Sequence, residues 1–202
     1  MHAALLDEFD ALDAAGLLTR DADCIHAAVG GGVAGDAASE AGDASATDGV
    51  AAWRRYEVMG VWHDRRDRHN CSLAAPSACA LLRKLGSLPD APRVLRAGYS
   101  ALAPSSWIRP HFGASNTVLK LHLGLRVPSA PTADGGTPCV WMRVGSSKGR
   151  TWTEGRVLLF DDSFEHEVLN QCASERVVFQ LVLRHPDLPA QEGLPSPLVS
   201  LH

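Results

Sequence analysis

Short apolar runs separated by proline and glycine clusters dominate the chain from residue 94 onward. Runs of this kind, rich in Val, Leu, Trp and Phe, are typical of β-strands bounded by turns. The expected strands are Val94–Leu102, Trp107–Phe112, Thr117–Val127, Cys139–Val144, Arg156–Phe160, Glu165–Asn170 and Arg176–His185. Short strands at this spacing predict an antiparallel sandwich or barrel.

The N-terminal part carries a different pattern. Within residues 3–18, apolar side chains recur at roughly helical intervals and predict an amphipathic helix; these are Leu5, Phe9, Leu12 and Leu17. Residues 21–50 are mostly Ala, Gly, Asp and Ser with no Lys or Arg, as in a flexible linker. A second helix is expected within residues 75–90, with Ser77 as its N-cap and Gly86 as its stop.

Length and composition favour one main domain, because the chain has 202 residues of which 46% are hydrophobic. We expect residues 51–186 to form this domain, residues 1–50 to supply the helix and flexible segment, and residues 187–202 to form a proline-rich tail. Mixed charges in Arg54–Asn70 predict a strand or irregular segment whose arginines face solvent. A net charge of -4 and the absence of a concentrated basic face exclude a nucleic-acid partner.

The N-terminus and the cysteines bear on location. The first residues contain acids where a secretory signal has positive charge, and no apolar run approaches the length of about 18 residues that spans a membrane. Five widely spaced cysteines without a CxxC pair favour reduced thiols over a disulfide framework. The protein is therefore expected to be cytoplasmic and without a membrane partner.

The strand "TVLKLHLGLRV" places its leucines on one face and its polar residues on the other, because strand side chains alternate. The leucine face must be buried. Lys120, His122 and Arg126 share the second face. On a half-exposed sheet these side chains would point into water, whereas in a barrel they would line a polar cavity. Alternation alone does not choose between the two.

A second polar cluster follows a buried run. Asp161 and Asp162 end the run "VLLF", His166 begins the next strand, and Arg176 opens another strand ten residues later. If the intervening residues form a hairpin, the guanidinium returns toward the imidazole. A cation beside a metal ligand is explained if both bind one dianion, chelated to the metal at one end and ion-paired to Arg176 at the other. A five-carbon oxo-diacid fits this arrangement.

The stretch "RPHFGASN" contains half of a known iron motif. A histidine followed two residues later by an acid begins the iron site of two histidines and one carboxylate. The residue two after His111 is Gly113, which cannot bind a metal. Either His111 is an ordinary imidazole, or a metal is held with one protein ligand missing.

The blocks "PHFGASNTVLKLHLGLRVP" and "WTEGRVLLFDDSFEHEVLN", followed by Arg176, resemble the aspartyl/asparaginyl β-hydroxylase family of iron(II) and 2-oxoglutarate oxygenases. The likeness runs from about Leu95 to Pro186. It implies a mainly β double-stranded β-helix, a cupin-like jelly roll with flanking N-terminal helices. Family members keep a glycine where Gly113 stands, so the resemblance implies that His111 and His166 alone hold iron.

The same resemblance assigns the remaining site residues. It pairs Arg176 with the far carboxylate of 2-oxoglutarate and places His122 and Lys120 near the carboxylate that chelates iron. The family commonly has arginine where Lys120 stands, so a planar fork is replaced by a point charge. Ser100 matches a serine that contacts the cosubstrate, and Trp62 is assigned to an aromatic wall.

The expected activity is oxidation by iron(II), 2-oxoglutarate and O2 of an unactivated carbon in an amino acid or a small derivative, with hydroxylation favoured. Substrate identity, oligomeric state and the occupant of the position beside Gly113, water or halide, stay open. Two other classes are kept. One is a non-catalytic or zinc-binding cupin, and the other is a dioxygenase with His122 as a third metal histidine and no need for 2-oxoglutarate.

Overall fold

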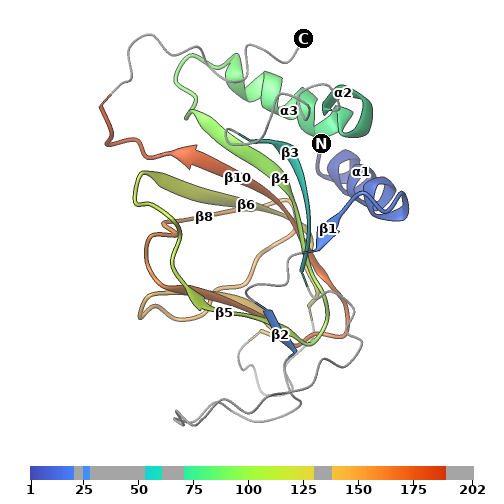
Figure 1. Cartoon of the computed structure of the whole chain (residues 1–202), viewed down its shortest axis with the longest axis vertical. Coiled ribbons are helices and arrows are strands. Elements are labelled where there is room, and N and C mark those ends of the chain that lie inside the picture. Colours follow the sequence, from blue (N-terminus) through green and yellow to red (C-terminus); the bar gives the residue numbers. More distant parts are fainter. Residues whose placement is uncertain (21–24, 28–52, 61–70, 130–137, 190–202) are drawn as a thin grey trace.

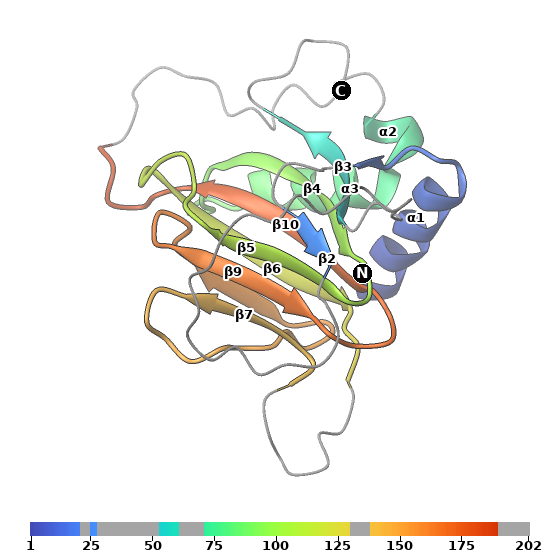
Figure 2. The ribbon, with the colours of Figure 1, turned by 60° about the horizontal axis from the view of Figure 1, so that its bottom comes forward.

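Two antiparallel sheets face each other, and the helices lie on the outer side of the larger sheet (Figure 1). The structure is a computed structural model and describes residues 1–20, 25–27, 53–60, 71–129 and 138–189. The larger sheet has six strands in the order β1-β3-β4-β10-β6-β8, and the smaller has four in the order β2-β5-β9-β7. Figure 2 shows the smaller sheet with β5 and β9 side by side.

The elements have the following bounds. The helices are α1 His2–Ala14, α2 Cys71–Ala74 and α3 Pro76–Gly86. The larger sheet comprises β1 Thr19–Arg20, β3 Trp53–Met59, β4 Val94–Leu102, β6 Val118–Arg126, β8 Val157–Phe160 and β10 Arg176–Arg184. The smaller sheet comprises β2 Ile25–Ala27, β5 Ser106–His111, β7 Val140–Val144 and β9 His166–Asn170.

Successive strands from β4 to β10 alternate between the two sheets. The chain therefore winds around one interior and forms a double-stranded β-helix, which confirms the expected jelly roll with flanking helices. The seven strands expected after residue 94 are confirmed with small shifts at their ends. The division into residues 1–50, 51–186 and 187–202 stays a prediction, and residues 28–52 and 190–202 lie outside the described part.

Each face of the larger sheet contributes to a separate apolar cluster. The outer cluster joins the sheet to α1 and α3 and includes Leu121, Leu123 and Leu125. The inner cluster lies between the sheets and includes Leu158 and Phe160. The prediction that the leucine face of β6 is buried is confirmed. Because side chains alternate along a strand, the opposite face of β6, with His122, points between the sheets.

The N-terminus of α3 is capped from a distance. The buried Glu8 carboxylate of α1 accepts the backbone N–H of Ser77 at 2.5 Å and that of Ala78 at 3.1 Å, and the Tyr99 hydroxyl donates to it at 2.6 Å. The expected Ser77 cap is wrong, because the N-cap position is Ala75 and its side chain cannot accept a hydrogen bond. A carboxylate here satisfies the free N–H groups of the first helical turn and fixes α1 against α3.

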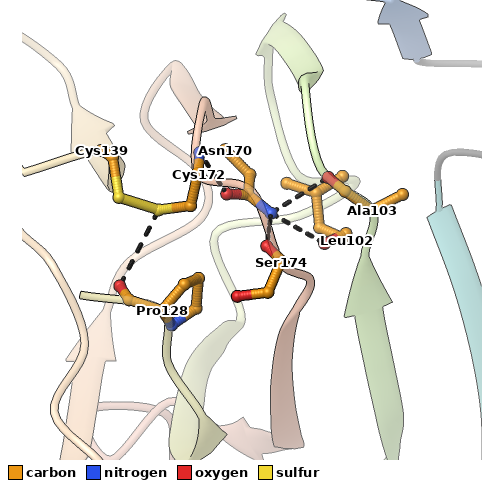
Figure 3. The surroundings of a disulfide bond; sticks show 7 residues. All are labelled: Leu102, Ala103, Pro128, Cys139, Asn170, Cys172 and Ser174. Carbon is orange, nitrogen blue, oxygen red and sulfur yellow. Dashed lines mark hydrogen bonds between the residues drawn. A yellow bond between two sulfur atoms is a disulfide. The ribbon is translucent and has the colours of Figure 1, made fainter. Parts of the chain in front are cut away.

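A disulfide joins Cys139 at the start of β7 to Cys172 after β9, with a Cα–Cα distance of 5.1 Å (Figure 3). Asn170 lies beside it, and its side-chain nitrogen is 3.0 Å from the carbonyl oxygens of Leu102 and Ala103. Cys79 is also disulfide-bonded. The expectation of reduced thiols is therefore wrong for these three cysteines, and the cysteine argument for a reducing compartment falls with it.

No helix within the described ranges is both long enough and apolar enough to cross a membrane.

Candidate functional site

Two histidines meet at one edge of the smaller sheet. β5 ends at His111, β9 begins at His166, and the two residues are direct cross-strand partners. Their ring centroids are 4.1 Å apart. Directly opposed residues in an antiparallel pair place their side chains on the same face, so register brings together two imidazoles that are 55 positions apart in the chain.

The hydrogen bonds of the two rings fix the same tautomer in both. His111 Nδ1 lies 2.7 Å from the Arg109 carbonyl oxygen, and His166 Nδ1 lies 3.0 Å from the Phe164 carbonyl oxygen. A carbonyl only accepts, so each Nδ1 must carry the proton. Each Nε2 is left with its lone pair, as in metal-bound histidines whose second nitrogen donates to a carbonyl.

His166 is the more buried of the two, and burial is the main cause that lowers its pKa below the ordinary value. The nearby His111 and Lys120 lower this pKa further if they are charged. A lowered pKa keeps the imidazole neutral at neutral pH, which is the form that binds metals. Among the described residues, no cluster of three or more His, Cys, Asp or Glu side chains could hold a metal.

Asp162 occupies the space beside Gly113. A Cβ added to Gly113 would lie 2.3 Å from Asp162 Oδ2 and 2.8 Å from the Asp162 carbonyl oxygen, and the Gly113 N–H already donates to that carbonyl at 2.6 Å. Asp162 Oδ2 pairs with Lys120 Nζ at 3.0 Å, while the buried Oδ1 has no hydrogen-bond partner among the described residues. A side chain at position 113 would therefore clash with Asp162, whose carboxylate lies beside Gly113.

His122 lies deeper in the interior and uses both ring nitrogens. The Trp152 indole, which can only donate, contacts Nδ1 at 3.3 Å, so Nε2 carries the proton and donates to Gln180 Oε1 at 3.1 Å. Burial first, and the charges of Arg176 and Lys120 second, lower the pKa of His122 well below its ordinary value. His122 is thus a neutral donor between the two cations.

Arg176 is a buried cation that forms no ion pair with any carboxylate of the described residues. The residue is 1% exposed, and within the described part of the chain its Nε and Nη1 have no hydrogen-bond partner. Burial lowers the pKa of Arg176 to about 10. Its guanidinium carbon lies 4.9 Å from the centre of the Trp152 ring, so one tryptophan contacts both Arg176 and His122. An unpaired buried charge is costly, which indicates that this position serves an anionic ligand.

Ser100 and Trp53 lie on the same interior wall. Ser100 is buried on β4 opposite Val178, two residues from Arg176 on β10. The Trp53 indole on β3 donates to Ser100 Oγ at 2.9 Å. Trp62, the expected aromatic wall residue, lies outside the described residues.

Trp53 and Trp152 are not among the expected site residues. Trp53 directly precedes the charged segment Arg54–Asn70, and its alternation with Arg55 and Glu57 is a usable strand signal. The described structure brings the expected residues His111, His166, His122, Lys120, Ser100 and Arg176 to one interior, which can combine a metal with an anion of two charged ends.

Comparisons with known proteins fit this geometry. The family model described as Aspartyl/Asparaginyl beta-hydroxylase matches residues 27–186. The Aspartyl/asparaginyl beta-hydroxylase of Mus musculus is 35% identical over 144 residues, which are 71% of this chain and 18% of that protein. The Aspartate beta-hydroxylase domain-containing protein 1 of Homo sapiens is 33% identical over 141 residues, 68% of this chain and 33% of that protein.

The chain therefore spans only a minor part of the length of these curated relatives. Solved structures with lower identity are also similar. A cupin domain from Bordetella pertussis tohama I is 11% identical with a TM-score of 0.35, over 46% of this chain and 83% of that one.

Proposed function

Because the chain belongs to the aspartyl/asparaginyl β-hydroxylase family, we propose that it is an iron(II)- and 2-oxoglutarate-dependent oxygenase that hydroxylates an amino acid or a small derivative. One observation carries the proposal. The buried Arg176 guanidinium, whose Nε and Nη1 have no hydrogen-bond partner among the described residues, shares an interior with two histidines whose Nδ1 protonation leaves the Nε2 lone pairs for a metal. A dianionic 2-oxo acid joins these two features, because it can chelate a metal and neutralise the cation.

The donor set fits iron(II). His111 and His166 would hold it through Nε2, since both Nδ1 atoms are committed to carbonyl oxygens. Imidazole suits iron, and the unpartnered Asp162 Oδ1 offers a hydrogen-bond acceptor beside the position that an acid ligand would occupy. Iron, when bound, supplies the reaction of O2 with 2-oxoglutarate, which gives succinate and oxidises an unactivated carbon.

The interior also fits 2-oxoglutarate. Arg176 would bind the far carboxylate, with the Ser100 hydroxyl, which accepts the Trp53 indole N–H, beside it as a further donor. The carboxylate next to the keto group would lie near the Lys120 ammonium, with the neutral His122 ring, held by Trp152 and Gln180, beside it. These donors are neutral or cationic, so each end of the dianion has a complementary group.

The alternative functions fit the same residues less well. His122 already engages Trp152 and Gln180 with its two nitrogens, which argues against a third metal histidine. A structural zinc site needs four protein ligands. A non-catalytic cupin would keep the cost of the buried Arg176 charge without a ligand to offset it.

Succinate formation tests the proposed function. Purified protein supplied with iron(II), ascorbate, 2-oxoglutarate and a set of amino acids should release succinate, and one of them should stimulate the release above the amino-acid-free level. Bound zinc with no succinate under any of these conditions would support the non-catalytic alternative instead. Oxygen consumption that does not require 2-oxoglutarate would support the dioxygenase with three histidines.

Substituting Gly113 should reveal its contact with Asp162. Gly113→Ala places a methyl group too close to the Asp162 carboxylate and carbonyl, so we expect a loss of about 1–3 kcal/mol in the free energy of unfolding. Asp162→Ala removes the carboxylate half of the clash. The double variant should therefore lose less than the sum of the two single losses in urea denaturation. Additive losses would contradict the contact.

The stability of the metal-free protein should fall as the pH drops below about 6.5. The pKa values of His122 and His166 are lowered in the folded protein, so as the pH falls the unfolded chain takes up their protons first. The stability they contribute is present above 6.5 and is lost below it, at up to about 1.4 kcal/mol per pH unit for each histidine. Urea denaturation at pH 7.5 and 5.5 measures this loss. A pH-dependent loss of equal size in His122→Asn would refute the contribution of His122. The variant His185→Ala, in the loop after β10, serves as the control.

A further inference from the structure

We propose that a cavity beside β3 and β4 binds the α-carboxylate of the substrate through Arg96, which makes the substrate a free amino acid. The inference rests on the proposed function and adds the residues that select the substrate. The cavity has a volume of about 480 Å3, which suits a single small molecule. Its polar lining includes Arg55, Glu57, Arg96, Ser100 and Gln180.

Arg96 is the charged group of the lining that can take a further anion. It lies on β4, where its Nη2 is 2.9 Å from Glu57 Oε2 of β3, and 40% of its side chain is exposed. An Arg fork that gives one nitrogen to a carboxylate keeps other N–H donors for a second carboxylate. Arg96 can therefore bind a ligand carboxylate beside that of Glu57.

The Glu57 carboxylate orients Arg96. Its second oxygen, Oε1, is buried without a hydrogen-bond partner in the described ranges and lies against Gly60, where an added Cβ would be 1.7 Å away. Gly60 leaves the room that this carboxylate needs. With one oxygen packed in this way and the other on Arg96, Glu57 fixes the direction of the guanidinium and acts as a positioning residue.

The cavity shares two lining side chains with the network around the proposed cosubstrate site. Gln180 and Ser100 line the cavity, and the same two side chains accept hydrogen bonds from His122 and Trp53. Gln180 therefore separates a ligand in the cavity from the imidazole that we assign to 2-oxoglutarate. A substrate in this cavity would lie next to the bound cosubstrate.

The register sets the size of the substrate. Arg96 is opposite Val182, which is opposite Lys120, so Arg96 and Lys120 are two strand spacings apart, about 10 Å. Lys120 pairs with Asp162 beside Gly113 and thus marks the metal end of the site. A molecule whose carboxylate binds Arg96 therefore needs to be only about as long as one amino acid to reach the metal end of the site. A residue inside a protein chain has no free α-carboxylate, because that group forms the peptide bond. Binding through Arg96 therefore selects against such residues.

A binding comparison tests this assignment without requiring turnover. Each of the twenty L-amino acids and its α-carboxamide is offered to the protein with 2-oxoglutarate, and binding is scored by ligand-observed NMR. We expect at least one amino acid to bind, with an affinity at least about tenfold above that of its carboxamide, because the amide cannot form the charged hydrogen bonds to Arg96.

Variants then locate the anchor. Arg96→Gln should raise the dissociation constant of that amino acid at least about tenfold, and Arg96→Lys should raise it less. The matched control is Arg143→Gln, because Arg143 is 46% exposed and also pairs with one carboxylate, that of Glu167, at 2.5 Å. The control should change the dissociation constant less than twofold. Melting temperatures of all variants exclude loss of folding as the cause.

Three results would overturn the assignment: no amino acid binds, acid and carboxamide bind equally, or Arg96→Gln and Arg143→Gln have the same effect. Binding of 2-oxoglutarate is scored in the same samples. If 2-oxoglutarate binds and the amino acids do not, the carboxylate anchor fails while the proposed function stands. If neither binds, the proposed function fails as well.

Discussion

Replacing His166 with alanine removes iron binding and stops succinate formation. Only two protein ligands hold the metal in the proposed site, and in other proteins the loss of a residue that merely supports a ligand already costs about 10- to 100-fold in metal affinity. We therefore expect a decrease of at least about 100-fold in the rate of succinate release. Metal content after purification and succinate release measure the two effects separately.

The matched control is His185→Ala. His185 lies in the loop after β10, where its Nδ1 is 3.2 Å from the Asp187 backbone nitrogen. Its removal should leave iron content and succinate release within about twofold of the original protein, because a surface substitution of this kind changes little. If His166→Ala keeps its iron and its turnover, the ion is held elsewhere and the proposed site is wrong.

Replacing Arg176 with methionine has opposite effects on ligand binding and on stability. The variant loses the charged hydrogen bonds to the far carboxylate, each worth about 1.5–3 kcal/mol. We expect the dissociation constant of 2-oxoglutarate to rise at least about 100-fold, because a guanidinium contributes two of them. Calorimetric titration of 2-oxoglutarate into the metal-loaded protein measures this change.

Without ligand, the same variant should be at least as stable as the original protein. Burial lowers the pKa of Arg176 to about 10, which corresponds to a penalty of roughly 3 kcal/mol for the buried charge. Methionine fills a similar volume without that penalty. Saturating 2-oxoglutarate should stabilise the original protein by about 2.7 kcal/mol at a hundredfold excess over the dissociation constant, and should not stabilise Arg176→Met.

Arg184→Met is the control for both effects. Arg184 lies on the same strand, and within the described part of the chain its guanidinium donates to the backbone carbonyls of Leu188, at 3.1 Å, and Pro189. This variant should bind 2-oxoglutarate normally. A large loss of stability in ligand-free Arg176→Met would show that the guanidinium has an internal anion, and the main argument for a dianionic ligand would fail.

The strands were predictable because their pattern is local. Alternation in "TVLKLHLGLRV" assigns the leucines to one face, and that face packs on the helices. Alternation did not settle whether His122 faces water or a cavity, since this depends on a second sheet lying across from it. The resemblance supplied the jelly roll, and the structure added the register that sets His111 opposite His166.

Long-range contacts were the part that the sequence could not supply. Ser77 looks like a helix cap within its own segment, yet the cap comes from Glu8, 69 positions away. Cys139 and Cys172 are 33 positions apart, and their spacing matches no motif. Both pairings depend on which elements pack together, which no window of the sequence encodes.

The measurement that tests the central claim most directly is anaerobic addition of iron(II) and 2-oxoglutarate to the purified protein, followed by visible absorption. A 2-oxo acid chelated to iron(II) gives a charge-transfer band. We expect one such complex per chain. The band should be absent in His111→Ala and His166→Ala, and in Arg176→Met it should form only at a much higher 2-oxoglutarate concentration. A band that persists in both histidine variants, or none in the folded original protein with both ligands bound, would contradict it.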